Sequence, residues 1–229
     1  MHNNATILLF AFRKSHIGFL NRIVKDSKLA ENFKVLSTRN LIFPSLIGIS
    51  NLKNINFKLI CEFATKEFYA KTNLKFPRFL VYNFFKIMAY VNYFRYYKAL
   101  SQRYTKMLLW NGGKFRQLIA IEIAKLKGIH VYYYENGLLP NTLVLDPKGI
   151  NFDNSVPRNR EFYESYKNNK ELPQELVPRA TRHIEKFNSN NVTELPLEYI
   201  FVPFQVDYDT QILKNSPWIE NMRELFNVI

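Results

Sequence analysis

The chain has 229 residues, of which 47% are hydrophobic and 22% are charged. This composition supports a sizeable core and excludes disordered and fibrous proteins. Lysine and arginine number 32 against 19 acidic residues, which gives a net charge of +13. Such a surplus points to a phosphate-bearing partner, an anionic lipid surface or a negatively charged small substrate, and charge does not decide among them.

The single cysteine, Cys61, excludes an intramolecular disulfide, so a reducing cytoplasm fits the chain best. Residues 5–12 form an apolar run without preceding cations or a following cleavage site, which predicts a buried strand and not a signal peptide. The apolar stretch 79–94 is interrupted by polar residues and falls short of the ~20 residues that span a bilayer. We therefore expect a cytoplasmic protein without a transmembrane segment, with peripheral attachment to the inner face of the cytoplasmic membrane as an option.

The first half of the chain predicts the beginning of a β-α-β pattern. Residues 5–12 predict a strand, residues 15–28 a helix capped by Ser15, and residues 33–37 a second strand. Residues 79–104 are too long and too continuous for a strand, so they predict one long helix, or two, after Pro77.

A compact β-α-β unit follows. It comprises a strand at 106–110, the turn Asn111-Gly112-Gly113, a helix at 114–127 that ends at Gly128, and a strand at 129–134. A strand, glycine turn, helix and strand in so few residues are typical of a crossover between parallel strands. The sequence therefore predicts an α/β fold with a Rossmann-like parallel sheet.

The last third of the chain is richer in loops, since eight of the ten prolines lie from Pro140 onward. A charged helical or linker region is expected at 158–187, a new strand at 199–203 and a last helix at 217–227. We therefore expect a Rossmann-like domain at 1–157, a helical linker region at 158–198, and the start of an incomplete second domain at 199–229.

Acidic residues follow two of the predicted strands. Ligands of open α/β sheets bind at the carboxyl ends of strands, so Glu135 is in the position of a catalytic carboxylate. Asp207 and Asp209 come just after the strand predicted at 199–203, and a pair of carboxylates suits glycosyl chemistry. Each of these acids also has a structural interpretation, as a cap of a turn or helix or as the partner of a lysine. Sequence spacing does not establish whether Glu135 meets either aspartate.

Several spaced strings occur in one order along the second half of the chain. They are W-N-G-G at 110–113, E-N-G-L-L-P at 135–140, V-L-D-P-K-G-I-N-F-D at 144–153, V-P-F-Q-V-D-Y-D-T-Q-I-L at 202–213 and N-S-P at 215–217. Together they resemble the capsule polysaccharide biosynthesis family of KpsC/KpsS-type β-Kdo glycosyltransferases. The resemblance covers residues 106–229, whereas the first hundred residues match only in general pattern.

The resemblance implies the N-terminal half of a GT-B glycosyltransferase fold, with the acceptor held by the N-terminal domain. It further implies transfer of Kdo (3-deoxy-D-manno-oct-2-ulosonic acid) from CMP-Kdo to a glycan or glycolipid, with retention of configuration. Asp209 matches the aspartate of the family's Q-V-x-x-D motif and is expected to be the nucleophile or to stabilise the anomeric carbon. Glu135 matches the acid of its E-x-G motif and is expected to be the acid/base.

A set of acceptor-binding residues completes the predicted site. His16 follows the first strand, where an acceptor could lie, and the Asn111-Gly112-Gly113 turn could offer backbone N–H groups to an anion or be purely structural. The expected set is Asn111, Gly112, Gly137, Asn151, Gln205 and His16. The histidines lack metal-ligand spacing, so no metal is expected, and CMP-Kdo would be a donor substrate and not a cofactor.

One departure from the family affects the expected activity. Family members continue into a donor-binding domain with a Lys-His-Pro motif and a serine-rich loop, and neither occurs in this sequence. The resemblance therefore predicts a fragment, a truncated or inactive form, or a chain that uses a separate donor-domain chain.

Residues 68–121 contain ten lysines and arginines and no acid, and eleven aromatic residues lie within 76–104. Cations and aromatic rings together suit an anionic membrane interface or a single-stranded nucleic acid. The alternative is a core helix whose lysines reach solvent, because the cations spread around the helix axis. The second functional hypothesis is therefore a non-catalytic basic module for anionic lipid or nucleic acid. No nucleic-acid-binding motif is recognised, so nucleic acid is not expected as a partner.

Overall fold

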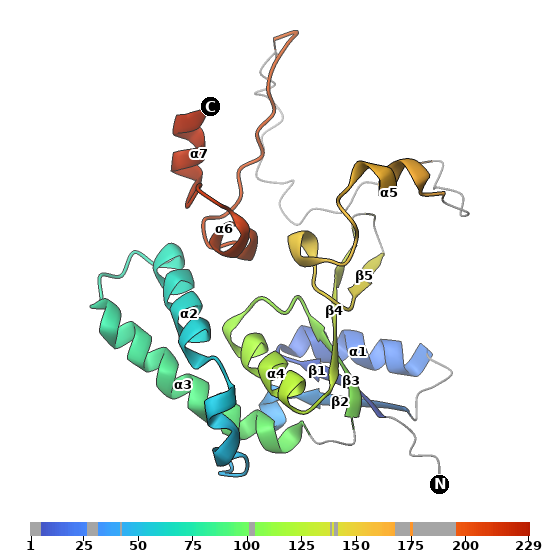
Figure 1. Ribbon diagram of the computed structural model, residues 1–229, viewed down its shortest axis with the longest axis vertical. Helices are drawn as coiled ribbons and strands as arrows, with labels where there is room; N and C mark the ends of the chain where they lie inside the picture. Colours follow the sequence, from blue (N-terminus) through green and yellow to red (C-terminus); the bar gives the residue numbers. More distant parts are fainter. Residues whose placement is uncertain are drawn as a thin grey trace.

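The structure of the protein is a computed structural model that describes residues 6–26, 32–41, 43–100, 104–137, 139, 142–167, 175 and 196–229. Its centre is a five-stranded sheet with the strand order β2-β1-β3-β4-β5 (Figure 1). The strands are β1 (Thr6–Ala11), β2 (Phe33–Ser37), β3 (Tyr104–Trp110), β4 (His130–Asn136) and β5 (Leu143–Asp146). The first four are parallel, and β5 runs antiparallel to β4. The predicted Rossmann-like α/β fold is confirmed, and the β4–β5 hairpin is an addition that the sequence analysis did not anticipate.

Helices cover both faces of the sheet (Figure 1). Helix α1 (Lys14–Asp26) lies on one face, whereas α2 (Phe57–Lys71), α3 (Arg78–Ala99) and α4 (Phe115–Leu126) lie on the other. Successive strand residues point to opposite faces, so Leu8 and Phe10 of β1 join the core beneath α2, α3 and α4, while Leu9 joins the core beneath α1. A sheet buried on both faces explains why β1 reads as a continuous apolar run.

Shorter elements complete the described chain. They are the 3₁₀ helices η2 (Thr38–Asn40), η3 (Ile49–Asn54) and η4 (Asn151–Asp153), and the α-helices α5 (Arg160–Ser165), α6 (Thr210–Asn215) and α7 (Met222–Val228). In the described part of the chain, no helix combines the length and the apolar character needed to cross a membrane.

Several element predictions were wrong. Helix α1 begins at Lys14, so Ser15 lies within the helix and is not its cap. The helix predicted at 79–104 ends at Ala99, and Tyr104 already belongs to β3, because its side chain packs into the core beneath the helices. Residues 199–203 form no strand, and Ile200 and Phe201 are 85% and 78% exposed. An apolar run becomes a strand only when a neighbouring strand accepts its backbone hydrogen bonds, and none does so in the described structure.

The remaining predictions for the last third are partly testable. Helix α5 lies within the region predicted as helical or linker, but residues 168–174 and 176–187 of that region lie outside the described residues. The last helix begins at Met222 and not at 217, because Asn221 caps it by accepting a hydrogen bond from the backbone N–H of Glu224. The proposed division into three domains stays a prediction.

Candidate functional site

The candidate residues lie at the edge of the sheet where the parallel strands end. Asn111 directly follows β3, and Glu135 is the next-to-last residue of β4. Glu135 was expected in a loop, but it is paired with Val144 of β5 in the antiparallel ladder. The carboxyl ends of parallel strands share one edge, so Asn111 and Glu135 are neighbours although they are 24 residues apart.

The turn after β3 is held by a single asparagine. Asn111 has a positive φ of 62°, and its backbone N–H donates to the carbonyl of Tyr134 at 2.9 Å. Its side-chain Oδ1 accepts from the N–H of Gly113 at 3.0 Å, which closes the turn. Its Nδ2 donates to Glu135 Oε2 at 3.3 Å. One amide side chain therefore fixes the turn and orients the carboxylate of β4.

The two glycines of this turn allow close approaches. Gly112 has a φ of 85°, and a Cβ there would lie 2.4 Å from the Tyr133 ring. A Cβ on Gly113 would lie 2.8 Å from Thr210 Cγ2, the first residue of α6. Gly112 thus packs beneath an aromatic ring, and Gly113 lets α6 rest on the turn.

Asp209 is brought to this edge by α6. It is the N-cap of that helix, and its Oδ1 accepts from the N–H of Gln211 at 2.8 Å, so the capping role considered from the sequence is realised. Burial raises the pKa of Glu135, the hydrogen bond from Asn111 opposes that shift, and the negative charge of Asp209 adds to it. Glu135 and Asp209 are therefore close enough to interact electrostatically, and Glu135 holds its proton more tightly than an ordinary glutamate.

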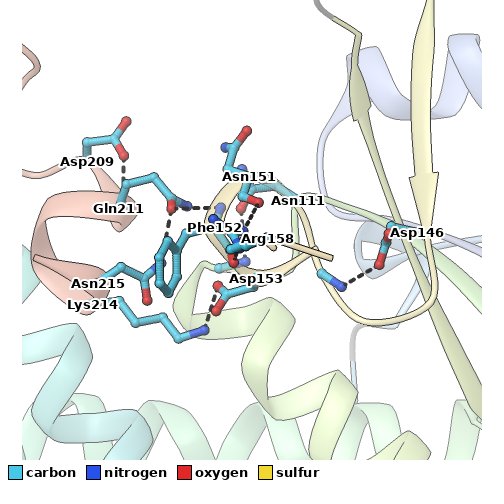
Figure 2. A network of polar contacts seen from close by, with 12 residues as sticks. Asn111, Asp146, Asn151, Phe152, Asp153, Arg158, Asp209, Gln211, Lys214 and Asn215 are labelled. Carbon is cyan, nitrogen blue, oxygen red and sulfur yellow. Dashed lines mark hydrogen bonds and ion pairs between the residues drawn. The ribbon is translucent and has the colours of Figure 1, made fainter. Parts of the chain in front are cut away.

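Figure 2 shows how α6 is anchored to the loop around η4. The N–H of Phe152 donates to Gln211 Oε1 at 3.3 Å, and Lys214 Nζ forms an ion pair with Asp153 Oδ2 at 2.7 Å. From the other side, Lys66 of α2 donates to the carbonyl of Leu213 at 3.3 Å. These contacts fix the start of α6, and hence Asp209, relative to the sheet.

Asp146 shapes the loop that receives α6. Its Oδ1 accepts from the backbone of Lys148 and Gly149, and its Oδ2 accepts from the backbone and hydroxyl of Ser155 at 3.0 and 2.6 Å. Burial raises the pKa of Asp146, but these four hydrogen bonds outweigh burial and lower the pKa to about 2. The D-P-K-G string therefore has a structural explanation.

Asp207 and three residues of the predicted set take part in local backbone structure. Asp207 accepts a hydrogen bond from the N–H of Met222, the first residue of α7, at 2.7 Å, beside the cap that Asn221 provides. Gln205 is exposed, and its N–H donates to Met222 Sδ at 3.1 Å. The N–H of Gly137 donates to the carbonyl of Thr142 at 2.8 Å, and Asn151 has a positive φ of 52° in the η4 loop.

A cavity of about 580 Å³ opens between the ends of β1 and β3. The strand order reverses at this point, since β2 lies on one side of β1 and β3 on the other, and open α/β sheets bind ligands at such a switch point. The loop after β1 contributes Arg13, and the end of β3 contributes Trp110 and Asn111. The cavity is therefore placed where the fold most readily takes a ligand, and we call it the switch-point cavity.

His16, in the first turn of α1, lines the switch-point cavity, and its role in acceptor binding stays a prediction. Its ring is only 8% exposed and stacks on Trp110 with centroids 5.4 Å apart. Burial lowers the pKa of His16, and the positive charge of Arg13 lowers it further. Its Nδ1 has no hydrogen-bond partner among the described residues, so a neutral imidazole is left with bonding capacity.

A second cavity of about 560 Å³ lies on the other side of the Asn-Gly-Gly turn, lined in part by Gly112, Gly113 and Thr210. Asn111 lines both cavities. Neither Glu135 nor Asp209 lines them directly, and the link to Glu135 runs through the Asn111 side chain. The structure therefore brings Asn111, Gly112, Glu135 and Asp209 to one edge of the sheet, and it leaves Gly137, Asn151 and Gln205 outside both cavities.

The sequence analysis missed an ion pair at the rim of the switch-point cavity. Lys114, just before α4, pairs with Glu67 of α2 at 2.6 Å, and both residues line the cavity. No sequence signal links residues 47 positions apart, although a lysine at the end of a glycine turn marks the position of Lys114. In the described ranges, no cluster of three or more His, Cys, Asp or Glu residues is arranged to hold a metal ion.

The fold and this edge thus define a Rossmann-like α/β protein with Glu135 and Asp209 at the edge where its parallel strands end. The chain is similar to Protein FixF from Sinorhizobium fredii (strain NBRC 101917 / NGR234), with 34% identity over 125 residues. The aligned residues make up 54% of this chain and 29% of FixF. FixF belongs to the capsule polysaccharide biosynthesis (KpsC-like) family, so the chain has distant similarity to a protein of that family. No family model and no solved structure matches the chain.

Proposed function

We propose that the chain is the acceptor-binding part of a glycosyltransferase for capsule or surface polysaccharide, which transfers Kdo from CMP-Kdo to a glycan or glycolipid. The observation that carries the proposal is the position of Glu135, bonded to Asn111 and close to Asp209, at the ligand-binding edge of the sheet. Distant similarity to FixF supports the same class. The donor would be held by a further domain or by a separate chain.

In the proposed reaction the two carboxylates have different tasks. Asp209 attacks the anomeric carbon of Kdo as the bond to the CMP oxygen breaks, and CMP leaves. The acceptor hydroxyl then attacks the same carbon, displaces Asp209 and gives its proton to Glu135, so the configuration is retained overall. The environment of Glu135 suits a proton acceptor, because burial raises its pKa and thereby its basicity.

The switch-point cavity is the proposed acceptor site. Its volume of about 580 Å³ lies in the range of ordinary ligand sites. His16 and Asn111 offer hydrogen-bonding groups from opposite strands of the switch point, and the Trp110 ring offers an apolar surface that suits a sugar face. An acceptor bound there lies next to the asparagine that holds Glu135.

The proposal is tested by pairing two substitutions that each remove one charge and keep a hydrogen-bond acceptor. Asp209→Asn removes a charge but keeps the cap of α6, because asparagine caps helices about as well as aspartate. Asp207→Asn likewise removes one charge and keeps an acceptor for the N–H of Met222, so it serves as the matched control. Transfer from CMP-Kdo to a Kdo-terminated acceptor is measured with the chain alone and with the donor-binding domain of a KpsC-like relative, fused or separate.

We expect no transfer by the chain alone, since the donor would not be held in attacking geometry. With the donor-binding domain present, transfer should appear, should be lost in Asp209→Asn and should persist in Asp207→Asn. Loss in both variants, or in Asp207→Asn only, would contradict the assigned nucleophile. If transfer never appears although both parts are folded, the proposed reaction is wrong.

An anionic membrane surface is proposed as a second partner because α3 exposes an apolar stripe. Leu80, Phe84 and Ile87 are 50%, 59% and 63% exposed, and their spacing of four and three residues places them on one side of the helix. Cations at Lys75 and Arg78 lie near its N-terminal end, in a segment without acids. Apolar side chains flanked by cations are typical of surfaces that bind anionic bilayers.

A further inference from the structure

A second group of cations surrounds a hollow beside the switch-point cavity. The hollow has a volume of about 360 Å³ and is lined by Phe12, Arg13, Lys14, Thr38, Arg39, Arg95 and Arg116. Five of these seven residues are cationic and none is acidic. We call it the basic hollow.

The basic hollow lies at the same edge of the sheet as the candidate site. Arg13 follows β1, Arg39 follows β2, and Arg116 lies in the first turn of α4. These cations come from three segments far apart in the sequence, so their meeting is a product of the fold and not of one charged run. The carboxyl ends of parallel strands are where α/β sheets bind ligands.

Most of these cations have unused bonding capacity. Among the described residues, Lys14, Arg13, Arg39 and Arg116 form no ion pair with a carboxylate. All four are exposed, so their charged groups can reach a ligand. Arg95 is different, because its guanidinium donates to the carbonyls of Thr38 and Leu41 and to Asn92 Oδ1, and it supplies charge while it holds the loop after β2.

A buried hydroxyl near the basic hollow also lacks a hydrogen-bond partner among the described residues. Phe12 lies against the ring of Tyr96, whose centroid is 6.2 Å away. The Tyr96 hydroxyl is buried and has no hydrogen-bond partner among the described residues. Burial raises the pKa of Tyr96 to about 12, while the nearby charges of Arg116 and Arg95 act in the opposite direction. A neutral hydroxyl donor therefore lies close to the same cations.

We propose that the basic hollow binds a phosphate group, carried by the ligand whose remaining part occupies the switch-point cavity. Phe12, Arg13 and Arg116 line both the hollow and the cavity, so one ligand can extend from one into the other. Identifying that ligand as the glycosyl acceptor rests on the proposed function, whereas phosphate binding itself does not.

Phosphate fits the basic hollow better than a carboxylate does. Three guanidinium groups in the hollow have free N–H donors, and each can bind two oxygens of a phosphate. A phosphate offers more terminal oxygens than a carboxylate and up to two negative charges. A single carboxylate has one charge and two oxygens, so it would leave most of these cations unpaired. The like charges already repel one another, and a dianion relieves that repulsion.

The experiment measures binding by the full chain, without CMP-Kdo and without transfer. Inorganic phosphate is titrated by calorimetry against acetate at equal ionic strength, and phosphatidic acid with two hexanoyl chains is titrated as a monomer. The test variant is Arg39→Gln with Arg116→Gln. The matched control is Arg22→Gln with Arg223→Gln, which removes two exposed charges outside the basic hollow.

We expect saturable phosphate binding that weakens at least tenfold in the test variant and less than twofold in the control. Binding of the short lipid but not of free phosphate, with the same loss in the test variant, would identify a lipid headgroup as the source and also supports the site. Equal losses in both double variants, or no preference for phosphate over acetate with no lipid binding, would overturn the proposal.

A third variant separates this inference from the proposed function. Glu135→Gln lies outside the basic hollow, so phosphate affinity should stay unchanged while transfer is lost. Phosphate binding without any transfer, with the folded donor-binding domain and CMP-Kdo present, would contradict the proposed function alone. Transfer without phosphate or lipid binding would contradict the basic hollow alone.

Discussion

The contact between Gly113 and α6 decides whether Asp209 reaches the candidate site, and it can be perturbed directly. In Gly113→Ala the new Cβ would lie 2.8 Å from Thr210 Cγ2 and 2.9 Å from Asn111 Oδ1. Gly113 does not have the positive φ of Gly112, so the cost is steric and not conformational. Overpacking of this kind costs about 1–3 kcal/mol of the free energy of unfolding.

A second substitution identifies the neighbour that causes the cost. Thr210→Ala removes both Thr210 atoms that the new methyl group would meet and leaves the Asn111 contact in place. The double variant should therefore regain part of the stability, with a coupling energy of about 1 kcal/mol between the two positions. The control is Gly18→Ala in α1, where a Cβ meets no atom within 4 Å and should stabilise the protein by up to about 1 kcal/mol.

Urea denaturation followed by circular dichroism measures all four variants. The expected order of stability places Gly18→Ala above the unmodified chain and the Gly113→Ala, Thr210→Ala double variant above Gly113→Ala. Additive effects of the two substitutions, within about 0.5 kcal/mol, would refute the packing of α6 on the turn. The proximity of Asp209 to Glu135 would then lose its structural basis.

Three further predictions concern single groups. Glu135→Gln should raise the free energy of unfolding at pH 7. The folded-state pKa of Glu135 is raised, so the unmodified chain loses stability as the pH rises above the ordinary pKa of 4.5. The stability gain of the variant should therefore vanish when denaturation is measured below that pH. Asp146→Asn should lower the free energy of unfolding by about 2 kcal/mol at pH 7, because the pKa of Asp146 is lowered from 3.8 to about 2 in the folded state. This contribution is lost as the pH falls toward 2, where the variant and the unmodified chain should be equally stable. Binding to vesicles with anionic lipid should exceed binding to neutral vesicles and should weaken with salt. Ile87→Ser should reduce this binding, whereas Val228→Ser, at a site with a similar exposed fraction, should not. Equal binding to neutral vesicles would contradict the proposed membrane surface.

The sheet could be predicted because its strands are marked locally. The apolar run of β1, the strand β2 and the strand-turn-helix unit around Asn111 carry turn and periodicity signals within a few residues. Helix α2 was not predicted although it also carries such signals, namely the Asn56 cap and the apolar residues Phe57, Ile60 and Cys61 on one face. The run at 199–203 was taken for a strand because hydrophobicity alone does not reveal whether a partner strand is available.

The candidate site shows the same limit. The position of Glu135 near the end of a strand followed from the β-α-β pattern, but the hydrogen bond that orients it comes from Asn111, on a neighbouring strand end. The helix cap formed by Asp209 is local and was considered from the sequence. The approach of Asp209 to Glu135, in contrast, depends on contacts between distant segments, which involve Gly113, Gln211 and Lys214. The basic hollow escaped notice because its cations come from segments far apart in the sequence.

The switch-point cavity and the basic hollow together predict different kinetic effects for substitutions in the hollow and for substitution of Glu135. An acceptor held by its phosphate in the basic hollow is placed next to Asn111 before the reaction begins, and this positioning is shared by the ground and transition states. In the reconstituted transferase, Arg39→Gln with Arg116→Gln should therefore raise the KM for a phosphorylated acceptor at least tenfold and leave kcat nearly unchanged. Glu135→Gln should lower kcat with little effect on KM, because proton transfer occurs only in the reaction step. A fall in kcat in the arginine variant, with KM unchanged, would mean that these cations stabilise the reacting groups and do not anchor the acceptor.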